Sequence, residues 1–223
     1  MVPQHVVQFY DDEAALIQSV SRYVTDGLDA RKSVVLVTSR ERQDALFSLL
    51  DQHSGDLVVL DSERTLGELF EGGKFSARRF DAVIGKVMRG AVSRSRSHGV
   101  RAYGDMVDVL WGCGCLNDAL ELERSWNDLQ AQLPFDLYCA YNVDLFDEFD
   151  PEAVASMLCS HSSVVPNYRS SELRSALEFA MYETLGGDVP RLTDPESAIL
   201  WLREHAPQQA REILTRARKY ASG

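Results

Sequence analysis

The sequence predicts an α/β fold in three layers: a mostly parallel central sheet, helices on both of its faces, and a helical tail at the C-terminus. Three observations lead to this prediction. Five short apolar runs rich in β-branched residues are typical of buried strands. Helical periodicity separates each run from the next, which favours parallel strands joined by crossover helices. From residue 170 onward the strand signals disappear and helical patterns predominate.

The first two strands are expected at residues 6–10 and 33–38. Asp11 is suited to cap the helix between them, and Gly27 is suited to end it. The helix itself shows apolar residues at helical spacing, namely Leu16, Ile17, Val20 and Val24. The β-branched run of the second strand indicates that this strand is buried on both faces.

The middle of the chain continues the alternation. A helix over 40–50 and a strand over 57–60 are followed by a short helix to Phe70, for which Asp61 or Ser62 is a suitable cap. Gly72 and Gly73 then mark a break. Beyond them, apolar residues recur at positions i, i+3 and i+4 over 80–92, which predicts the clearest amphipathic helix of the chain.

Two more strands are expected at 100–104 and 136–141, and the helix between them buries the stripe Leu122, Trp126, Leu129 and Leu133. We expect a domain over 1–168 and a helical extension over 169–223, with Asp-Pro helix starts at 150–151 and 194–195. An apolar stripe in the extension is a candidate dimer or partner surface, or else docks within the chain: Ile199, Leu202, Ile213, Leu214 and Ala217.

Composition limits the possible functions. The chain has 223 residues, 45% of them hydrophobic, which is enough for a substantial core. Its 34 acidic and 23 basic residues give a net charge of −11, which argues against binding to nucleic-acid backbones. The sequence shows no signal peptide and no apolar run of membrane-spanning length, and its four cysteines form no secreted framework. These features predict a reduced cytoplasmic protein.

Polar residues stand where the predicted strands end, and ligands of open α/β sheets bind at that edge. The candidate ligand-binding residues are Tyr10, Ser39, Arg40, Asp105, Tyr141 and Asn142. Each has an alternative role. Tyr10 suits a core position, Ser39 suits a helix cap beside a solvated Arg40, and Asp105 suits the cap of a helix that starts at Met106. His5 lies at the other end of the first strand from Tyr10, so the two need not share a site.

Motifs for catalysis, phosphate or metal are weak. No Gly-rich loop with a terminal Gly-Lys-Ser/Thr follows a strand, and Asp11-Asp12 would repel phosphate. Cys113 and Cys115 enclose a single residue, whereas structural zinc sites place two to four residues between paired cysteines, and nothing in the sequence places Cys159 or His161 beside them. Small buried thiols in a turn are the simpler interpretation, with a disulfide switch as an alternative. No nucleophile elbow is present. We therefore expect no metal, no cofactor and no catalytic residue.

Paired carboxylates are also absent from the predicted helix around residue 122. Glu121 and Glu123 are two residues apart, so they face different sides of a helix, and one of them is suited to bind a neighbouring arginine. His161 is expected to cap a helix or to line a cleft near the end of the domain.

Several segments in the same order resemble the MEDS family, the methanogen/methylotroph, DcmR-type sensory domain. They cover residues 4–166: His5 to Asp11 with its helix to Gly27-Leu28, Arg101 to Met106, Leu122-Glu123 with Trp126-Asn127, Cys139 to Tyr141, and Cys159 to Ser162. Each motif is weak, but the ordered set is fairly specific. The family usually shows Glu where this chain has Asp105, which is one methylene shorter.

This resemblance implies a RecA-like core, related to clock-type ATPases, in a sensory module that binds small ligands such as hydrocarbon derivatives. It implies a non-catalytic role in signal transduction. We expect output through a partner such as a histidine kinase or transcription regulator, with a homodimer as a further option and no direct contact with nucleic acid or membrane. The alternatives are a nucleotide-binding protein or residual ATPase with a degenerate phosphate loop, and an interaction scaffold without ligand.

Overall fold

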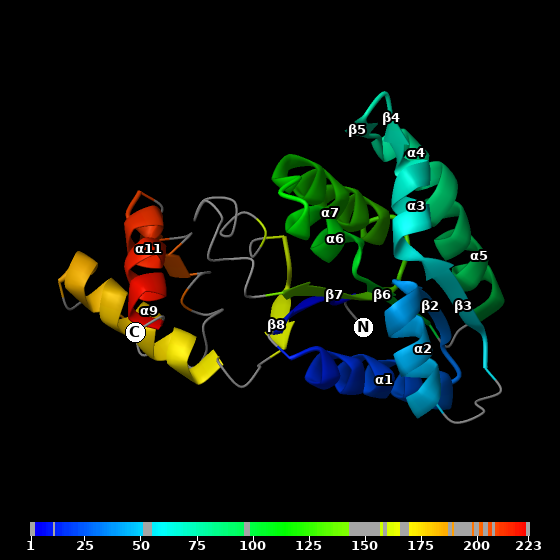
Figure 1. The fold of residues 1–223 in the computed structure, drawn as a ribbon, viewed down its shortest axis with the longest axis horizontal. Helices are drawn as coiled ribbons and strands as arrows, with labels where there is room; N and C mark the ends of the chain where they lie inside the picture. The colour runs from blue at the N-terminus through cyan, green and yellow to red at the C-terminus, as the bar shows by residue number, and fades with distance from the viewer. Residues whose placement is uncertain are drawn as a thin grey trace.

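A computed structural model describes residues 3–10, 12–50, 55–95, 99–142, 157, 160–165, 170–186, 189, 198, 201–202, 205–206 and 208–221. In these ranges the central sheet has six strands in the order β3-β2-β6-β7-β1-β8, and every neighbouring pair is parallel (Figure 1). The strands are β1 (His5–Tyr10), β2 (Ser33–Thr38), β3 (Leu57–Asp61), β6 (Val100–Gly104), β7 (Asp136–Asn142) and β8 (Ser163–Val165).

Helices cover both faces of this sheet, as Figure 1 shows. On one face lie α1 (Glu13–Asp29) and α2 (Arg40–Leu49), whose buried side chains join those of Val34, Leu36 and Tyr103. The other face carries α3 (Ser62–Leu69), α4 (Ala77–Phe80), the π-helix η1 (Asp81–Gly85), α5 (Lys86–Ser95), α6 (Met106–Gly112) and α7 (Leu116–Gln130). The predicted three-layer α/β fold is therefore confirmed.

The ends of the first helix differ from the prediction. Asp12 caps α1, since its side chain accepts a hydrogen bond from the amide of Ala14 at 2.9 Å, while Asp11 lies outside the described residues. Gly27 does not end the helix, which continues to Asp29. A Cβ at position 27 would stand 3.0 Å from the side chains of Val34 and Arg101, so this glycine permits close helix–sheet packing instead.

The break at Gly72 and Gly73 is a tight turn. Both glycines have positive φ, 60° and 79°, and they join β4 (Phe70–Glu71) to β5 (Lys74–Phe75) in a small antiparallel hairpin. Two central residues with positive φ are what a type I′ hairpin turn requires. The amphipathic stretch beyond it is helical throughout, through α4, η1 and α5, and it buries Phe80, Ile84 and Met88.

The sheet also contains a strand that the sequence did not predict. β8 pairs with β1 over three residues, with Val6 opposite Ser163. It has only three residues, which is too short for alternation to be recognised. Asp150, Pro151, Asp194 and Pro195 lie outside the described residues.

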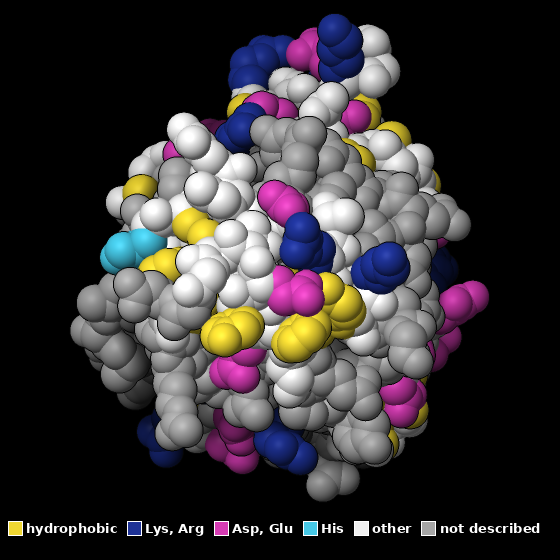
Figure 2. Space-filling view, turned by 90° about the vertical axis from the view of Figure 1, so that its left-hand side faces the viewer, with side chains coloured by type: hydrophobic (Ala, Val, Ile, Leu, Met, Phe, Trp, Pro, Cys, Tyr) yellow, Lys and Arg dark blue, Asp and Glu magenta, His cyan; other side chains and the backbone are white. Residues whose placement is uncertain are grey.

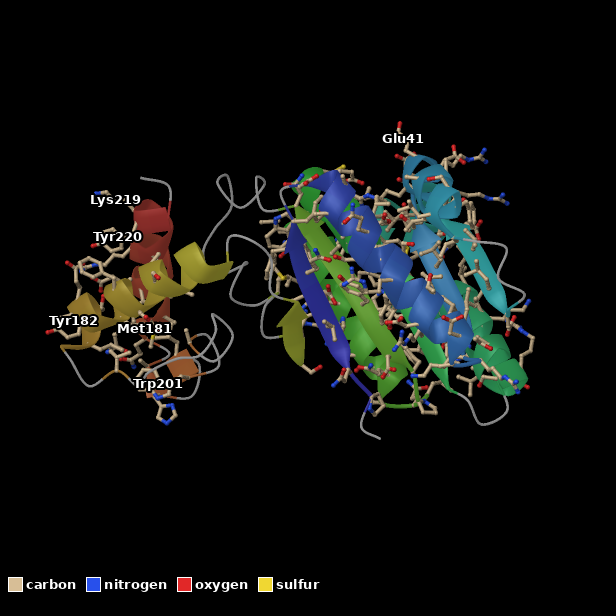
Figure 3. All side chains as sticks on the ribbon, turned by 90° about the horizontal axis from the view of Figure 1, so that it is seen from below. Glu41, Met181, Tyr182, Trp201, Lys219 and Tyr220 are labelled. Carbon is tan, nitrogen blue, oxygen red and sulfur yellow. The ribbon has the colours of Figure 1, made fainter. Side chains whose placement is uncertain are left out.

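The C-terminal helices α9 (Ser170–Leu185) and α11 (Ala210–Ala221) form a hydrophobic core of their own, which includes Met181, Leu202, Ile213 and Ala217 (Figure 3). Leu202, Ile213 and Ala217 are at most 1% exposed, so docking within the chain is the correct alternative for these three residues of the stripe. The side chains of Ile199 and Leu214 lie outside the description.

The aromatic side chains that α9 and α11 expose do not belong to the predicted apolar stripe: Phe179, Tyr182 and Tyr220. Figure 2 views this end of the molecule and shows hydrophobic side chains close to acidic and basic ones. The division at residue 168 stays a prediction. Within the described segments, no helix has both the length and the apolar character needed to cross a membrane.

Candidate functional site

Strands β2 and β6 are neighbours in the sheet, and the chain leaves them toward opposite faces. After β2 it enters α2 on one face, and after β6 it enters α6 on the other. Such a reversal is the topological switch point at which open α/β sheets bind ligands, beyond the carboxyl ends of the strands. Thr38 and Asp105 stand at these two strand ends.

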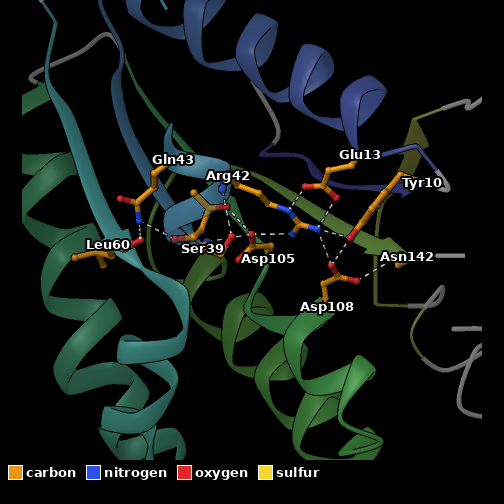
Figure 4. Close-up of polar contacts among 10 residues, drawn as sticks. Tyr10, Glu13, Ser39, Arg42, Gln43, Leu60, Asp105, Asp108 and Asn142 are labelled. Atoms are coloured by element: carbon orange, nitrogen blue, oxygen red, sulfur yellow. Dashed lines mark hydrogen bonds and ion pairs between the residues drawn. The ribbon is translucent and has the colours of Figure 1, made fainter. Parts of the chain in front are cut away.

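Arg42, in the first turn of α2, is the centre of a polar cluster at this edge (Figure 4). Its guanidinium donates to Asp105 Oδ2 at 2.9 Å, to Asp108 Oδ2 at 3.2 Å and to Glu13 Oε1 at 2.6 Å. It also contacts the hydroxyl of Tyr10, which donates to Asp108 Oδ2 at 2.5 Å. We call Tyr10, Glu13, Arg42, Asp105 and Asp108 the Arg42 cluster.

Asp105 is fully buried, and its carboxylate serves the cluster rather than its own helix. Its Oδ2 accepts hydrogen bonds from Thr38 Oγ1 at 2.5 Å and from the Ser39 amide at 3.4 Å. Asp105 stands at the N-cap position of α6, but its side chain makes no capping bond there, so the alternative role as a side-chain cap is wrong. Its second oxygen, Oδ1, is buried and has no hydrogen-bond partner among the described residues.

The Arg42 cluster carries more negative than positive charge. One guanidinium faces three carboxyl groups, of Glu13, Asp105 and Asp108. Burial raises the pKa of Asp108 above its ordinary value, and burial together with Asp108 also raises the pKa of Tyr10. A buried excess of carboxylate favours a bound proton, a cation or a hydrogen-bond donor.

The structure brings four of the six predicted site residues to this edge. Tyr10 and Asp105 belong to the Arg42 cluster itself. The backbone amide of Ser39 donates to Asp105, and the backbone amide of Asn142 donates to Asp108 Oδ1 at 2.8 Å. Arg40 is not among them. Its side chain is 85% exposed and pairs with Asp61, while Ser39 caps α2 through its side chain, as the alternative interpretation of this pair proposed.

Tyr141, the sixth residue, points to the α7 face of the sheet and joins a second polar cluster. Its hydroxyl donates to Glu123 Oε1 at 2.5 Å. Around Glu123 lie His5 and His161, whose Nε2 atoms are each 3.3 Å from one carboxylate oxygen. Cys139 Sγ is 3.4 Å from His5 Nε2. We call His5, Glu123, Cys139 and His161 the His5 cluster.

The His5 cluster is deeply buried. The side chains of His5, Glu123 and His161 are at most 3% exposed, and Cys139 is fully buried. Burial lowers the pKa of His5 to about 4. Burial alone would raise the pKa of Glu123, but His161 and His5 outweigh it and hold that pKa at about 2.

Sequence reasoning missed Arg42 because the arginine that it considered beside the strand end was Arg40. It also did not single out Asp108 in α6 or Glu13 in α1. On an N-terminal helical turn, two residues of separation decide which arginine points toward the sheet. For Glu121 and Glu123 the reasoning was correct. Glu121 is half-exposed and pairs with Arg124, whereas Glu123 is buried on the opposite side.

The cysteines behave differently from one another. Cys113 is exposed, so the expectation of a buried thiol is wrong there, and Cys115 is partly buried. His161 packs on His5, with ring centroids 4.2 Å apart, and its Nδ1 contacts the carbonyl of Met157, a helical residue, as the cap interpretation proposed. All four residues of the His5 cluster stand in the segments that carry the family resemblance, but those segments are spread over more than 150 positions.

The fold and the polar cluster at the strand ends define an α/β domain with a candidate site at the switch point of its sheet. The family model of the MEthanogen/methylotroph, DcmR Sensory domain (MEDS) matches residues 4–162, and the chain belongs to this family of sensory domains. No curated protein and no solved structure matches the chain. The likeness to RecA-type ATPases stays a prediction.

Proposed function

We propose that this chain is a non-catalytic signalling module that binds a small ligand at the Arg42 cluster and passes the binding on to a partner protein. The observation that carries the proposal is Asp105 Oδ1, a buried carboxylate oxygen that lacks a hydrogen-bond partner among the described residues. Buried polar atoms are nearly always paired, so an unpaired one at a switch point indicates a missing donor. Membership of a sensory family supports the same role.

The charges favour a ligand with a hydrogen-bond donor, such as an alcohol or an amine. The guanidinium of Arg42 already serves three carboxyl groups, so the cluster has no spare cation for an anionic ligand. The hydroxyl of Tyr103 is also buried without a hydrogen bond in the described part of the chain. Burial, together with the nearby charge of Asp105, raises the pKa of this hydroxyl. A small hydroxyl or amino compound would supply donors to these oxygens.

The nucleotide-binding alternative has less support. Helix N-termini bind phosphate through free backbone amides. At the start of α2, the Ser39 amide is already bonded to the carboxylate of Asp105, and Asp108 and Glu13 surround the same position. A phosphate placed there would face these negative groups rather than donors, which opposes binding.

A thermal-shift panel tests the proposal. The probes are short-chain alcohols, primary amines, carboxylic acids, inorganic phosphate and ATP with magnesium, each added to the full chain. We expect alcohols or amines to raise the melting temperature, because a ligand that binds only the folded state stabilises it by mass action. The shift should disappear in Asp105→Asn, where the acceptor loses its charge.

Arg40 offers a matched control. Arg40→Ala removes an exposed arginine two positions from Arg42, so it should leave the shift unchanged. A shift with ATP and magnesium that is lost in Arg42→Ala would favour the nucleotide-binding alternative instead. If no probe shifts the melting temperature while a pulldown finds one partner that Asp105→Asn still binds, the scaffold alternative is favoured.

Signal output through a histidine kinase or a transcription regulator is the part of the proposal that rests on the family alone. A pulldown from the native host, with and without the ligand that the panel identifies, tests it. We expect the amount of captured partner to depend on the ligand in the wild type and not in Asp105→Asn.

A further inference from the structure

The His5 cluster has the composition of a transition-metal site. Two imidazoles, one thiol and one carboxylate are the ligand types that zinc uses in proteins. One ligand atom from each of the four side chains lies within 4.8 Å of the other three. The four residues come from β1, α7, β7 and the position two residues before β8, so the tertiary structure brings them together from distant parts of the chain.

Three distances within the His5 cluster are close to those between neighbouring ligand atoms of a tetrahedral zinc site. Zinc–nitrogen and zinc–oxygen bonds of roughly 2.1 Å and a zinc–sulfur bond of about 2.3 Å place neighbouring ligand atoms about 3.3–3.6 Å apart. His5 Nε2 and His161 Nε2 each lie 3.3 Å from an oxygen of Glu123. The distance from His5 Nε2 to Cys139 Sγ is 3.4 Å.

The outer nitrogens of both histidines are held by acceptors. His5 Nδ1 lies 2.8 Å from Asn127 Oδ1, and the Nδ2 group of Asn127 donates to the Ser160 carbonyl, which leaves its oxygen to accept. His161 Nδ1 lies 2.9 Å from the Met157 carbonyl. Metal-binding histidines usually donate their other ring N–H to such an acceptor, so both side chains have the orientation in which Nε2 binds a metal ion.

Two atoms of the His5 cluster lack a hydrogen-bond partner in the described part of the structure. They are Oε2 of Glu123 and Nε2 of His161, and both are buried. The Tyr141 hydroxyl donates to Oε1 of Glu123, and the Nε2 atoms of His5 and His161 each lie 3.3 Å from a carboxylate oxygen. Buried polar atoms are nearly always paired, and a metal ion between these two atoms would bind both of them.

From this geometry we propose that the His5 cluster is a four-coordinate site for a divalent transition metal of the zinc class. His5 Nε2, His161 Nε2, Cys139 Sγ and one Glu123 oxygen would be its ligands. Four protein ligands close the coordination sphere, which is typical of a structural site. Asn127 and the Met157 carbonyl act as the second shell that orients the imidazoles. Coordination by Cys139 releases the thiol proton to solvent.

The proposed site would link the segment around His161 to strands β1 and β7 and to helix α7. His161 is two residues before β8, the edge strand beyond which the chain continues to α9. Among described contacts, the Ser162 hydroxyl and amide also bind the backbone of His5. Metal occupancy would thus stabilise the end of the sensory domain that leads to the C-terminal helices.

Metal titration of the full chain tests the proposal. The protein is treated with a chelator, shown by circular dichroism to be folded, and titrated with Co²⁺ as the spectroscopic probe. We expect one equivalent to bind, with the intense visible bands of a tetrahedral site and a thiolate charge-transfer band. Displacement of Co²⁺ by Zn²⁺ should abolish both signals and should raise the melting temperature.

Variants assign the ligands. Cys139→Ala should lose the thiolate band, whereas the matched controls Cys113→Ala and Cys115→Ala should keep it. Asn127→Ala should weaken Zn²⁺ binding roughly 10- to 100-fold, as expected for loss of a second-shell partner. This variant keeps all four ligands, so it tests the site even if Cys139→Ala does not fold.

Three results would overturn the proposal. The folded wild type binds no Co²⁺ or Zn²⁺ in competition with a weak chelator, or the thiolate band follows Cys113 or Cys115, or Asn127→Ala binds Zn²⁺ as tightly as the wild type. None of these results affects the proposed ligand site, because the Arg42 cluster shares no residue with the His5 cluster.

Discussion

The Arg42 cluster and the His5 cluster both hold carboxylates against the same sheet, but they neutralise them differently. In the Arg42 cluster the protein supplies its own cation, bonded to Asp105, Asp108 and Glu13. In the His5 cluster the Nε2 atoms of two imidazoles lie 3.3 Å from the carboxylate of Glu123. The first cluster is balanced in part by a cation of the chain, whereas for the second we propose a metal ion.

Exposure separates the two clusters as well. The Arg42 side chain is 14% exposed and that of Glu13 is 54% exposed, so solutes can reach this edge. The His5 cluster lies between the sheet and α7, with side chains that are at most 3% exposed. An accessible edge suits reversible ligand binding, and a closed interior suits an ion that remains in place. The following predictions test this contrast, from the largest expected effect to the smallest.

Replacing the buried carboxylate of the His5 cluster should have the largest effect. Glu123→Ala removes the acceptor of the Tyr141 hydroxyl and leaves a cavity, and we expect a loss of about 3–5 kcal/mol in the free energy of unfolding. Urea denaturation measures it. The control is Glu121→Ala, two residues away on the same helix but exposed, which should be nearly neutral. Equal losses in the two variants would contradict the role of Glu123 as the buried carboxylate of the His5 cluster.

Removing the cation of the Arg42 cluster should follow. Arg42→Met leaves Asp105 and Asp108 without their ion pair, and we expect a loss of about 3 kcal/mol in unfolding free energy, as for a broken buried pair. Arg40→Met is the matched control on the same turn and should change stability little, because that side chain is exposed. If the two variants unfold at the same urea concentration, Arg42 is not the centre of the cluster.

A single hydrogen bond within the Arg42 cluster should matter less. Thr38→Val keeps the shape of the side chain but removes the donor to Asp105, so we expect a loss of about 1–2 kcal/mol in unfolding free energy. A double-mutant cycle with Asp105→Asn measures the coupling. The two losses should add to more than the loss in the double variant; strict additivity would show that the bond contributes nothing.

The smallest effect concerns pH. Because burial raises the pKa of Asp108, the folded state keeps a proton at pH values where the unfolded chain has lost it. Stability should therefore fall as pH rises from the ordinary Asp pKa to the raised one, by less than about 1.4 kcal/mol per pH unit. Asp108→Asn should flatten this slope in unfolding measured across the acidic range. An unchanged slope in the variant would assign it to another group.

Much of the fold could be predicted from the sequence because the signals are local. The apolar run 33–38 and the stripe containing Trp126 follow from backbone periodicity, and Gly72-Gly73 predicts a break, which the structure shows to be a hairpin turn. β8 was missed because three residues carry no period, and Gly27 was misread because its role is to let Arg101 and Val34 approach. Such contacts depend on elements far apart in the chain.

The two polar sites divide in the same way. The sequence by itself determined that polar residues end the strands, and it placed Tyr10 and Asp105 at that edge. Only the tertiary structure decided that Arg42 rather than Arg40 joins them, because the helix start at residue 40 sets which side chain points inward. Only the tertiary structure also assembled the His5 cluster, since parallel pairing of β1 with β7 brings His5 beside Cys139 across more than 130 residues. The contacts that join these residues form between segments far apart in the sequence, so they exist only once the sheet is assembled.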